Sequence, residues 1–452
     1  MKRVLIVSYY YPPSSAVGAV RPSKFADYLP AFGWHPTIVT ATARSTATHS
    51  DVGEGCNNGA VRAVVYHAAE WWHPLKAYER IRERAAAKRG KIDEHAAKII
   101  MPYAQCYDAT RGGLKRWLLA FLWLPDRETA WLVPAVLRGL REMRRSGVQH
   151  VITTGPPFTC HLIGLALKWL TGARWIADFR DPWSLRHKFP IFRNGATDKV
   201  ESRLIAAVMQ HADVILSVTD AMTDEAKNEH ASVPHERFHT LMSGFDPDDF
   251  SGINWTRPYP DPVIFSYFGT FYHGRTPEPF LGALKSLLDD GSLKPRDIRV
   301  RFVGQVSLAD GQPVVEMLRY LGVESLVSLH TPVPRREALK QTLESHVALV
   351  LDERHPVQIP LKLYDAMAAG VTVFNVGSGG SSADVLRRTG RGVSVSYERP
   401  ADVRAGILEC VKRARSAVTT CSATPWDDPA IQEFHFGHLT GRLATYLDTL
   451  SP

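Results

Sequence analysis

The chain has 452 residues, of which 45% are hydrophobic and 22% are charged, and its formal net charge is +8. This composition is that of a globular protein, it excludes a disordered or fibrous chain, and the length suits two domains rather than one. The apolar stretches at residues 4–7 and 117–125 are too short for a signal peptide or a membrane span. The five cysteines form no CxxC pair and fit a reducing compartment, so we expect a cytoplasmic protein.

The first half of the chain alternates short apolar runs with helical patterns. Strands are predicted at residues 3–8, 37–42, 150–155, 173–179 and 213–219, and helices at 24–33, 128–147, 160–172, 199–212 and 220–230. Glycines follow the helical patterns at Gly147 and Gly172, as C-terminal caps do, and Asp220 is the expected N-cap of its helix.

The same alternation restarts after a proline-rich joint at residues 255–262. Strands are predicted at 263–271, 299–305, 326–333, 347–353, 371–377 and 393–398, and helices at 276–291, 360–370, 381–390 and 400–417. Thr276 and either Ser381 or Ser382 are the expected N-caps of two of these helices. Apolar strands separated by helices are typical of parallel sheets, so the two series predict two doubly wound domains that bind ligands at their strand ends.

The stretch from Trp71 to Ala120 carries most of the excess positive charge. It contains eleven lysines and arginines against five acidic residues, together with three tryptophans and three tyrosines. Such a pattern suits an anionic surface, either phospholipid or a phosphorylated substrate, although a helix with a solvated charged face gives the same pattern. Since no nucleic-acid-binding signature accompanies it, we expect no nucleic acid partner.

The loop SYYYPPSSAVGAVRP, from Ser8 to Pro22, follows the first predicted strand and precedes a helical pattern. Gly18 lacks a Cβ atom, so a ligand could approach the backbone there, and a helix N-terminus after such a loop attracts phosphate. An ordinary surface loop has the same composition, and the local sequence leaves both interpretations open.

Two segments of the second half carry candidate residues for an anionic ligand. In FGTFYHGR, Gly269 ends a strand and Arg275 either pairs with a diphosphate or lies on the surface. In PLKLYDAMAAG, Lys362 and Asp365 share one helix face. Asp365 therefore either pairs with Lys362 or accepts from two vicinal hydroxyls, as on a ribose.

A third segment, ADFRDPW, places Asp178, Arg180 and Asp181 at the end of a predicted strand. Burying charged side chains at a strand end is costly unless they are paired or bind a ligand. These residues therefore either line a reaction centre or form an internal Asp–Arg pair that braces a cleft. The histidines are scattered, and no His, Cys and Asp cluster has the spacing of metal ligands, so no metal site is expected.

Taken together, these motifs resemble those of the family 4 glycosyltransferases of the GT-B fold, and most closely a bacterial branch with a YYPP opening and a DFRDPW motif. The matching segments appear in the expected order over nearly the whole chain: the opening loop, TTGPPFTCH, ADFRDPW, MSGFDPDDF, YFGTFYHGR, and LKLYDAMAAG followed by GSGG. The resemblance implies a hexosyltransferase that uses a nucleotide-sugar donor, retains the anomeric configuration and requires no metal or other cofactor.

The resemblance also implies the GT-B architecture: two facing Rossmann-like α/β domains with a central cleft and a C-terminal crossover helix. The acceptor-binding domain is expected at residues 1–252, with the basic insert at about 70–120. The nucleotide-sugar-binding domain is expected at residues 262–425. An amphipathic helix at residues 428–452 is expected to pack back on the first domain.

Individual residues take predicted roles from the same resemblance. Asp365 matches the acid that binds the donor ribose, while Arg275 and Gly18 match residues at the diphosphate. The predicted donor-binding residues are Gly18, Gly269, Thr270, Arg275, Lys362, Asp365, Gly379, Gly380 and Ser381. The predicted catalytic residues are Asp178, Arg180, Asp181 and His161, and the predicted acceptor-binding residues are Tyr11, Arg21 and Trp183.

Three positions depart from the family pattern, one of which is a catalytic-region histidine of many members that falls near Arg180 here. The family often has two glutamates eight residues apart, but Val357 replaces the first and Asp365 the second, which removes the expected contact of the first acid with the sugar. Thr270 stands where the family often has an arginine after the strand-end glycine, so Arg275 is left to supply more of the positive charge. No residue is assigned as the general base.

The sequence thus predicts a cytoplasmic glycosyltransferase of surface polysaccharide or glycolipid assembly, which contacts the inner face of an anionic membrane through residues 71–120. The rival acceptor is a small soluble metabolite, such as an antibiotic aglycone or an aminocyclitol. A GT-B nucleotide-sugar epimerase would turn over the donor without an acceptor. A silent sugar-binding or scaffold protein would bind a nucleoside diphosphate and release none from any donor.

Overall fold

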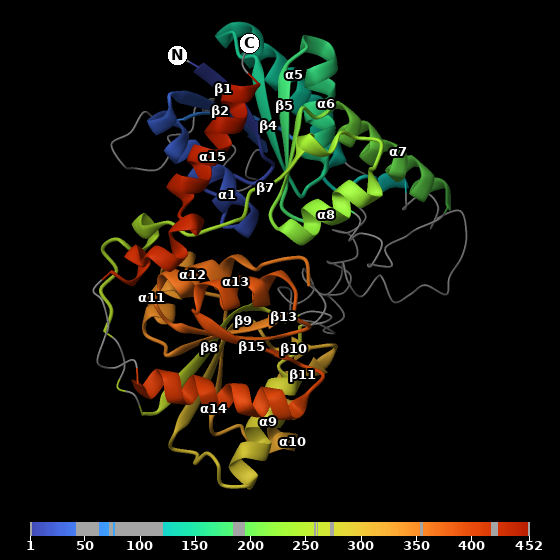
Figure 1. Ribbon diagram of the computed structural model, residues 1–452. Coiled ribbons are helices and arrows are strands. Elements are labelled where there is room, and N and C mark those ends of the chain that lie inside the picture. The colour runs from blue at the N-terminus through green and yellow to red at the C-terminus, as the bar shows by residue number, and fades with distance from the viewer. Residues whose placement is uncertain are drawn as a thin grey trace. The chain divides into compact units, whose positions relative to one another are not determined.

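The computed structural model describes residues 2–41, 63–71, 76, 121–183, 195–256, 259, 261–271, 275–352, 356–416 and 424–450. The chain divides into two compact units, here called unit 1 and unit 2 (Figure 1). Unit 1 comprises Met1–Val218, Met222–Leu241 and Thr440–Pro452, and unit 2 comprises Thr219–Ala221 and Met242–Leu439. The basic insert predicted at about residues 70–120 lies almost entirely outside the described residues.

Unit 1 is built on a seven-stranded parallel sheet with the order β3-β2-β1-β4-β5-β6-β7. Its strands are β1 (Lys2–Val7), β2 (Trp34–Ala41), β3 (Val64–Ala68), β4 (His150–Gly155), β5 (Arg174–Phe179), β6 (Val214–Ser217) and β7 (Phe238–Thr240). Its helices are α1 (Val20–Tyr28), α5 (Leu132–Ser146), α6 (Thr159–Thr171), α7 (Gly195–His211), α8 (Asp220–Glu229) and the larger part of α15 (Phe436–Thr449). The central strands β4 and β6 are buried throughout, as expected of a parallel sheet covered on both faces.

Unit 2 is built on a six-stranded parallel sheet with the order β12-β9-β8-β13-β14-β15. Its strands are β8 (Val263–Thr270), β9 (Ile298–Gln305), β12 (Val327–His330), β13 (Val347–Asp352), β14 (Thr372–Gly377) and β15 (Gly392–Ser396), with a small hairpin of β10 (Leu308–Ala309) and β11 (Gln312–Pro313). Its helices are α9 (Glu278–Asp289), α10 (Val314–Leu321), α11 (Arg335–Leu343), α12 (Leu361–Ala368), α13 (Ser381–Thr389) and α14 (Pro400–Ser416).

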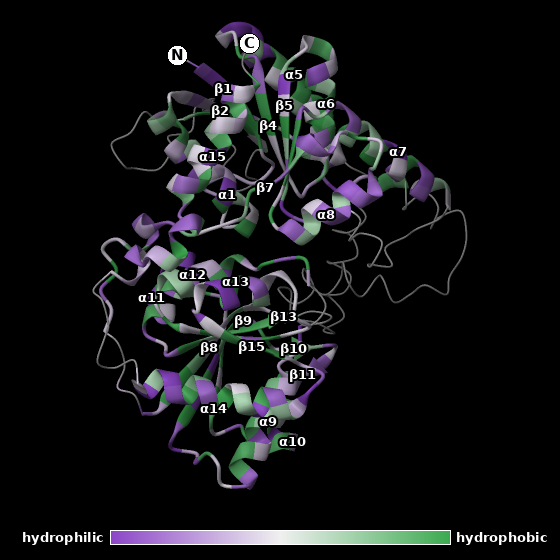
Figure 2. Ribbon diagram, in the orientation of Figure 1, coloured by the Kyte–Doolittle hydropathy of each residue, from purple (hydrophilic) through white to green (hydrophobic). Residues whose placement is uncertain are grey.

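Two apolar cores cover the two faces of the unit 2 sheet. Alternate residues of β13 point to opposite faces, so Leu349 joins the core of α9, α10 and α14, whereas Val350 joins that of α11, α12 and α13. Figure 2 shows the same separation in colour, with hydrophobic residues along the strands and polar residues on the outer turns of the helices. This packing fixes the strand ends, where the candidate site lies.

Short 3-10 helices complete the described elements: η1 (Val17–Ala19), η2 (Leu29–Phe32), η3 (Thr129–Trp131), η5 (His235–Arg237), η6 (Pro247–Phe250), η8 (Pro425–Asp427) and η9 (Pro429–Phe434). Among the residues that the structure describes, no helix is both long and apolar enough to cross a membrane.

Several element boundaries differ from the sequence-based predictions. Helix α1 starts at Val20 and includes Pro22 in its first turn, where a missing N–H costs nothing. The expected serine caps of α13 are wrong, because its N-cap is Gly380, which has no side chain. Helices α10 and α11 and strands β3 and β7 were not predicted at all.

Candidate functional site

A basic cluster lies beside the carboxyl ends of β8 and β13 in unit 2. The Lys362 amine lies 3.6 Å from the centroid of the Tyr267 ring, and a Cβ atom added to Gly269 would lie 3.5 Å from that amine. Asp352, the last residue of β13, interacts electrostatically with both Arg275 and Lys362. The cluster therefore combines two basic side chains and one acidic side chain with a strand end that has no side chain.

The Lys362 amine is buried and has no hydrogen-bond partner within the described part of the chain. Burial and the charge of Arg275 lower the pKa of Lys362 well below its usual value, and Asp352 opposes them only in part. An ammonium group in this position lacks the hydrogen bonds that normally compensate for its desolvation. A bound anion that accepted from Nζ would supply them.

The pKa of Asp352 is raised, whereas that of Lys362 is lowered. Asp352 also connects the basic cluster to α13. Burial raises the pKa of Asp352 to about 6, against the effects of Arg275, the Ser382 hydrogen bond and Lys362. Ser382 Oγ donates to Asp352 Oδ2 at 2.9 Å. Since Ser382 lies in the first turn of α13, this bond ties a helix N-terminus to the basic cluster. Neither residue was predicted to belong to the site.

The turn before α13 depends on two glycines with left-handed backbone conformations. Gly379 has φ 88° and Gly380 has φ 80°, and a Cβ atom added to Gly380 would lie 2.1 Å from the Pro356 carbonyl oxygen. The Ser381 amide donates to that same oxygen at 2.8 Å. The chain before α13 thus passes so close to Pro356 that only glycine fits at position 380.

Asp365 does not form the helix-face ion pair with Lys362 that the sequence left open. Instead, its two oxygens accept from the Arg335 guanidinium at 2.8 and 2.9 Å, and Arg335 also donates to Asp249 at 3.0 Å. Burial disfavours a charge here, but Asp365 and Asp249 outweigh it and raise the pKa of Arg335. Arg335 begins α11, a helix that the sequence analysis missed.

A small cavity of about 50 Å³ lies next to this pair in unit 2. Its lining includes Phe268, Arg335, Lys362 and Asp365. The cavity thus brings two predicted donor-binding residues together with Arg335. Thr270, a further predicted residue, ends β8 and accepts a hydrogen bond from the Tyr267 hydroxyl through its carbonyl at 2.9 Å.

In unit 1, the first acidic residue of the ADFRDPW motif, Asp178, forms a buried ion pair. Arg21 donates to Asp178 through Nε at 3.0 Å and Nη2 at 2.8 Å, and Thr154 Oγ1 donates to the same carboxylate at 2.8 Å. The exposed fractions are 3% for Arg21 and zero for Asp178. Asp178 therefore positions Arg21 near the start of α1. To contact a reactant, as predicted, the Asp178 carboxylate would have to move away from Arg21 and Thr154.

Arg180 ties the opening loop to β4 and β5. Its guanidinium donates to the backbone carbonyls of Gly18 and Pro156. A Cβ atom added to Gly18 would lie 3.0 Å from Tyr10 and 3.1 Å from Arg180, so the small residue lets this side chain approach. The sequence left open an internal Asp–Arg pair within this motif; in the structure Asp178 pairs with Arg21, and Arg180 donates to these two carbonyls.

His161 lies in the core of unit 1. Its Nδ1 is 2.8 Å from Thr153 Oγ1, and its ring lies 4.2 Å from the ring of Phe179. Burial lowers the pKa of His161 to about 3, so the imidazole is neutral at pH 7. Its Nε2 has no hydrogen-bond partner in the described residues and lies against Gly155, where an added Cβ atom would be 2.7 Å away.

The remaining predicted residues of unit 1 lie around the same strand ends. Trp183 stacks on Phe158 with ring centroids 4.6 Å apart and donates to Glu201 at 3.1 Å. Tyr11 is 8% exposed, whereas Asp181 is half-buried just after β5. In the described residues no group of three or more His, Cys, Asp or Glu could hold a metal ion.

No family model matches the chain, and no curated protein matches it in sequence. Solved structures nevertheless resemble it along its whole length. Sucrose-phosphate synthase from Thermosynechococcus elongatus matches with 14% identity, a TM-score of 0.64 and 100% coverage of both chains. HepE from Anabaena, in complex with UDP-glucose, matches with 11% identity, a TM-score of 0.60 and 100% coverage of both chains. WaaG, a glycosyltransferase involved in lipopolysaccharide biosynthesis, matches with 13% identity, a TM-score of 0.57 and coverage of 98% of this chain and 99% of its own.

At these identities the likeness concerns the fold. The two parallel-sheet α/β units are Rossmann-like domains that match the GT-B glycosyltransferase fold, which confirms the predicted fold class.

Proposed function

We propose that this protein is a nucleotide-sugar-dependent glycosyltransferase of family 4 that transfers a sugar to an acceptor hydroxyl with retention of anomeric configuration. In this reaction the bond between the anomeric carbon and the diphosphate oxygen breaks, and a bond from that carbon to the acceptor oxygen forms. The acceptor proton leaves with the diphosphate or passes to solvent. The GT-B fold, the ordered motifs and the HepE complex with UDP-glucose support the proposal.

The observation that carries the proposal is the unpaired Lys362 amine beside Arg275 and the N-terminus of α13. Two basic side chains, a helix dipole and a strand end without a side chain form a site that favours a diphosphate, whose charge would in turn favour the protonated form of Lys362. The same charges would stabilise the negative charge that develops on the leaving diphosphate. We assign Gly269, Thr270, Gly379, Gly380 and Ser381 to the backbone that lines this donor group.

Asp365 is proposed to accept from the donor ribose hydroxyls. Each carboxylate oxygen can accept more than one hydrogen bond, so the Arg335 pair does not exclude this role. Arg335 fixes the orientation of the carboxylate through these two hydrogen bonds. We therefore add Arg335 to the donor site as a positioning residue.

In unit 1 the proposed acceptor and reaction residues divide into two groups. Tyr11, Arg180, Asp181 and Trp183 are proposed to line the acceptor and reaction centre, and Gly18 the donor diphosphate. Arg21, Asp178 and His161 are buried, and Asp178 positions Arg21 through their ion pair. The general base stays unassigned.

The donor site can be tested by a thermal-shift screen of nucleoside diphosphates and their sugars, followed by affinity measurements on Lys362→Met. Loss of one charge-assisted contact to phosphate should weaken diphosphate binding about tenfold or more. Lys412→Met, at an exposed position of α14, is the matched control and should bind as the parent protein does. If no nucleoside diphosphate binds, or if both variants bind equally well, the proposed donor site is wrong.

Retention and the metal requirement need a turnover assay. With the donor identified by the screen, NMR of the product should show the anomeric configuration of the donor, and activity should persist in a chelator. An inverted product or loss of activity with chelator would contradict those parts of the proposal.

We propose a membrane-associated acceptor of surface polysaccharide or glycolipid assembly, because residues 71–120 combine basic and aromatic residues. Co-sedimentation with anionic liposomes at low salt should retain the protein, whereas neutral liposomes should not. Without this difference, the soluble acceptor is favoured.

A second candidate, a binding protein without transferase activity, is favoured by Val357 in place of the first family acid. Such a protein would bind the nucleoside diphosphate but release none from any donor sugar. A donor-only epimerase would release product without an acceptor.

A further inference from the structure

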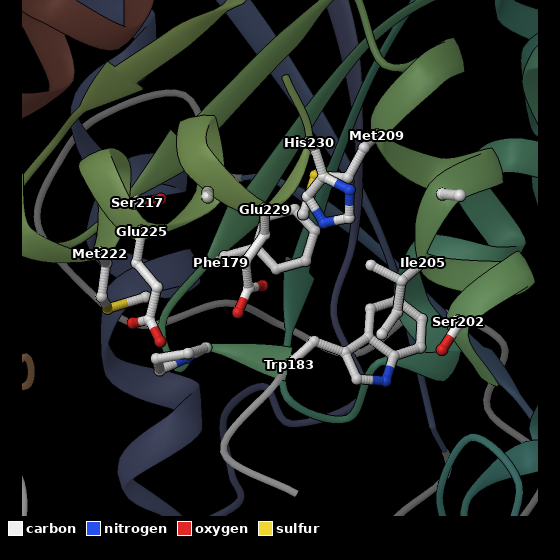
Figure 3. A pocket seen from close by; sticks show the side chains of 13 residues that line it. Phe179, Trp183, Ser202, Ile205, Met209, Ser217, Met222, Glu225, Glu229 and His230 are labelled. Carbon is white, nitrogen blue, oxygen red and sulfur yellow. The ribbon is translucent and has the colours of Figure 1, made fainter. Parts of the chain in front are cut away.

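A pocket of about 390 Å³ lies in unit 1 between α7 and α8, beside the carboxyl ends of β5 and β6 (Figure 3). Its volume falls in the range of about 300–1,000 Å³ that is usual for small-molecule sites. Its buried apolar wall consists of Phe179, Trp183, Ile205, Met209 and Met222. The wall presents a preformed surface, because the Trp183 indole is fixed by its stacking on Phe158 and its hydrogen bond to Glu201.

The opposite side of the pocket is acidic. Glu225 and Glu229 lie one turn apart on α8, and Figure 3 shows both carboxylates extending from that helix in the same direction. Within the described residues neither makes an ion pair or a hydrogen bond, and no lysine or arginine lines the pocket. Burial and the charge of Glu225 raise the pKa of Glu229, and burial lowers the pKa of His230, which also lines the pocket.

An independent observation indicates a ligand. Ser217, the last residue of β6, lines the pocket and is 3% exposed, yet its hydroxyl makes no hydrogen bond with any described residue. Ser217 Oγ is not among the fully enclosed unpartnered atoms, so the hydroxyl is open to a group that enters the pocket. A polar group of a bound molecule would satisfy Ser217 on one side while a positive charge met the carboxylates on the other.

We propose that this pocket binds a small molecule that carries a primary ammonium group and a hydroxyl on a compact ring, as aminosugars and aminocyclitols do. The ammonium group pairs with Glu225 and Glu229, the ring packs against the face of Trp183, and the hydroxyl reaches Ser217. A cation near an aromatic face gains further stabilisation. The inference concerns unit 1 alone and does not depend on the proposed transfer reaction.

The test compares 2-aminocyclohexanol with 1,2-cyclohexanediol, which replaces the ammonium by a neutral hydroxyl on the same ring. Ligand-observed NMR titrations with the full-length protein at pH 7 should show the amine binding at least about tenfold more tightly than the diol. Glu225→Gln and Glu229→Gln should each weaken amine binding by about tenfold. Asp224→Asn, at an exposed position of the same helix, is the matched control and should leave binding unchanged.

Three results would overturn the proposal: equal affinity for the amine and the diol, no binding of the amine at millimolar concentration, or an equal loss of affinity in Asp224→Asn. Because all three variants replace partly or fully exposed carboxylates, each should fold, and circular dichroism verifies this before titration.

Discussion

At the scale of single residues, the interior contains several charged side chains, and they differ in whether their polar atoms have hydrogen-bond partners. Asp178 is fully compensated, with hydrogen bonds from Arg21 and Thr154. Lys362 and Asp352, by contrast, keep atoms that lack a hydrogen-bond partner in the described residues. The compensated group stabilises the fold, whereas the uncompensated groups weaken it and are available to a ligand.

The first prediction concerns Asp178. Replacing one partner of a buried ion pair leaves the other uncompensated, so Asp178→Asn should lower the free energy of unfolding by about 3–5 kcal/mol. Asp384→Asn breaks a pair whose side chains are 75% and 66% exposed, and should cost less than about 1 kcal/mol. Urea unfolding of both variants measures the difference, and equal losses would show that burial does not decide the effect.

The second prediction concerns Asp352 and pH. Burial raises the pKa of Asp352 to about 6 in the folded state, above its value of about 4 in an unfolded chain. The contribution of this group to stability is therefore greatest below pH 4 and is lost as the pH rises through 6. Asp352→Asn removes this dependence, so its stability relative to the parent should be about 1–2 kcal/mol more favourable at pH 8 than at pH 5. Urea unfolding at the two pH values measures this, and an unchanged difference would refute it.

At the scale of elements, the turn before α13 shows how a site element depends on close backbone contact. Gly379 and Gly380 both have positive φ, but only Gly380 faces the Pro356 carbonyl. A side chain at position 379 therefore meets backbone strain alone, whereas one at position 380 meets strain and a steric clash.

The third prediction uses this pair of glycines. Gly379→Ala adds only the cost of a left-handed alanine, about 1–2 kcal/mol. Gly380 has φ 80° and ψ −159°, a combination open essentially only to glycine. Gly380→Ala therefore adds this strain and also forces the chain at Pro356 away, so it should cost more than Gly379→Ala and weaken nucleoside diphosphate binding as well. Thermal unfolding and the diphosphate titration measure the two effects. Equal behaviour of the variants would mean that the contact with Pro356 is not needed.

The alternation of strands and helices could be predicted because a buried parallel strand is a short, continuous apolar run, which can be recognised in a single sequence. It missed α11 because its buried positions, including Leu339 and Leu343, are few in a mainly polar helix. Arg335 was missed with it, although VPRREALK offers a proline followed by charged residues at a helix start. Asp352 and Ser382 could not be predicted as partners, since 30 residues separate them and only the folded chain brings them together.

At the scale of the whole molecule, unit 1 is not continuous in sequence. Its last segment, Thr440–Pro452, follows nearly two hundred residues of unit 2 and contains most of α15. Asp448 accepts from Lys2 at 2.6 Å and from the Trp34 indole at 3.0 Å, which connects the end of the chain with its first two strands. The first two strands of unit 1 therefore contact residues that follow unit 2 in the sequence.

The fourth prediction follows from this arrangement. Ending the chain after Leu439 removes Leu443, Ala444 and Leu447, all of them buried. Each large apolar side chain contributes about 1.5–3 kcal/mol, so unit 1 should lose several kcal/mol of stability. Because unit 2 retains its own two cores, its amides should keep their protection in hydrogen exchange while those of unit 1 exchange faster. Asp448→Ala, which removes only the polar contacts, should cause a smaller loss confined to β1 and β2. Equal loss of protection in both units would show instead that the chain unfolds as a single cooperative whole.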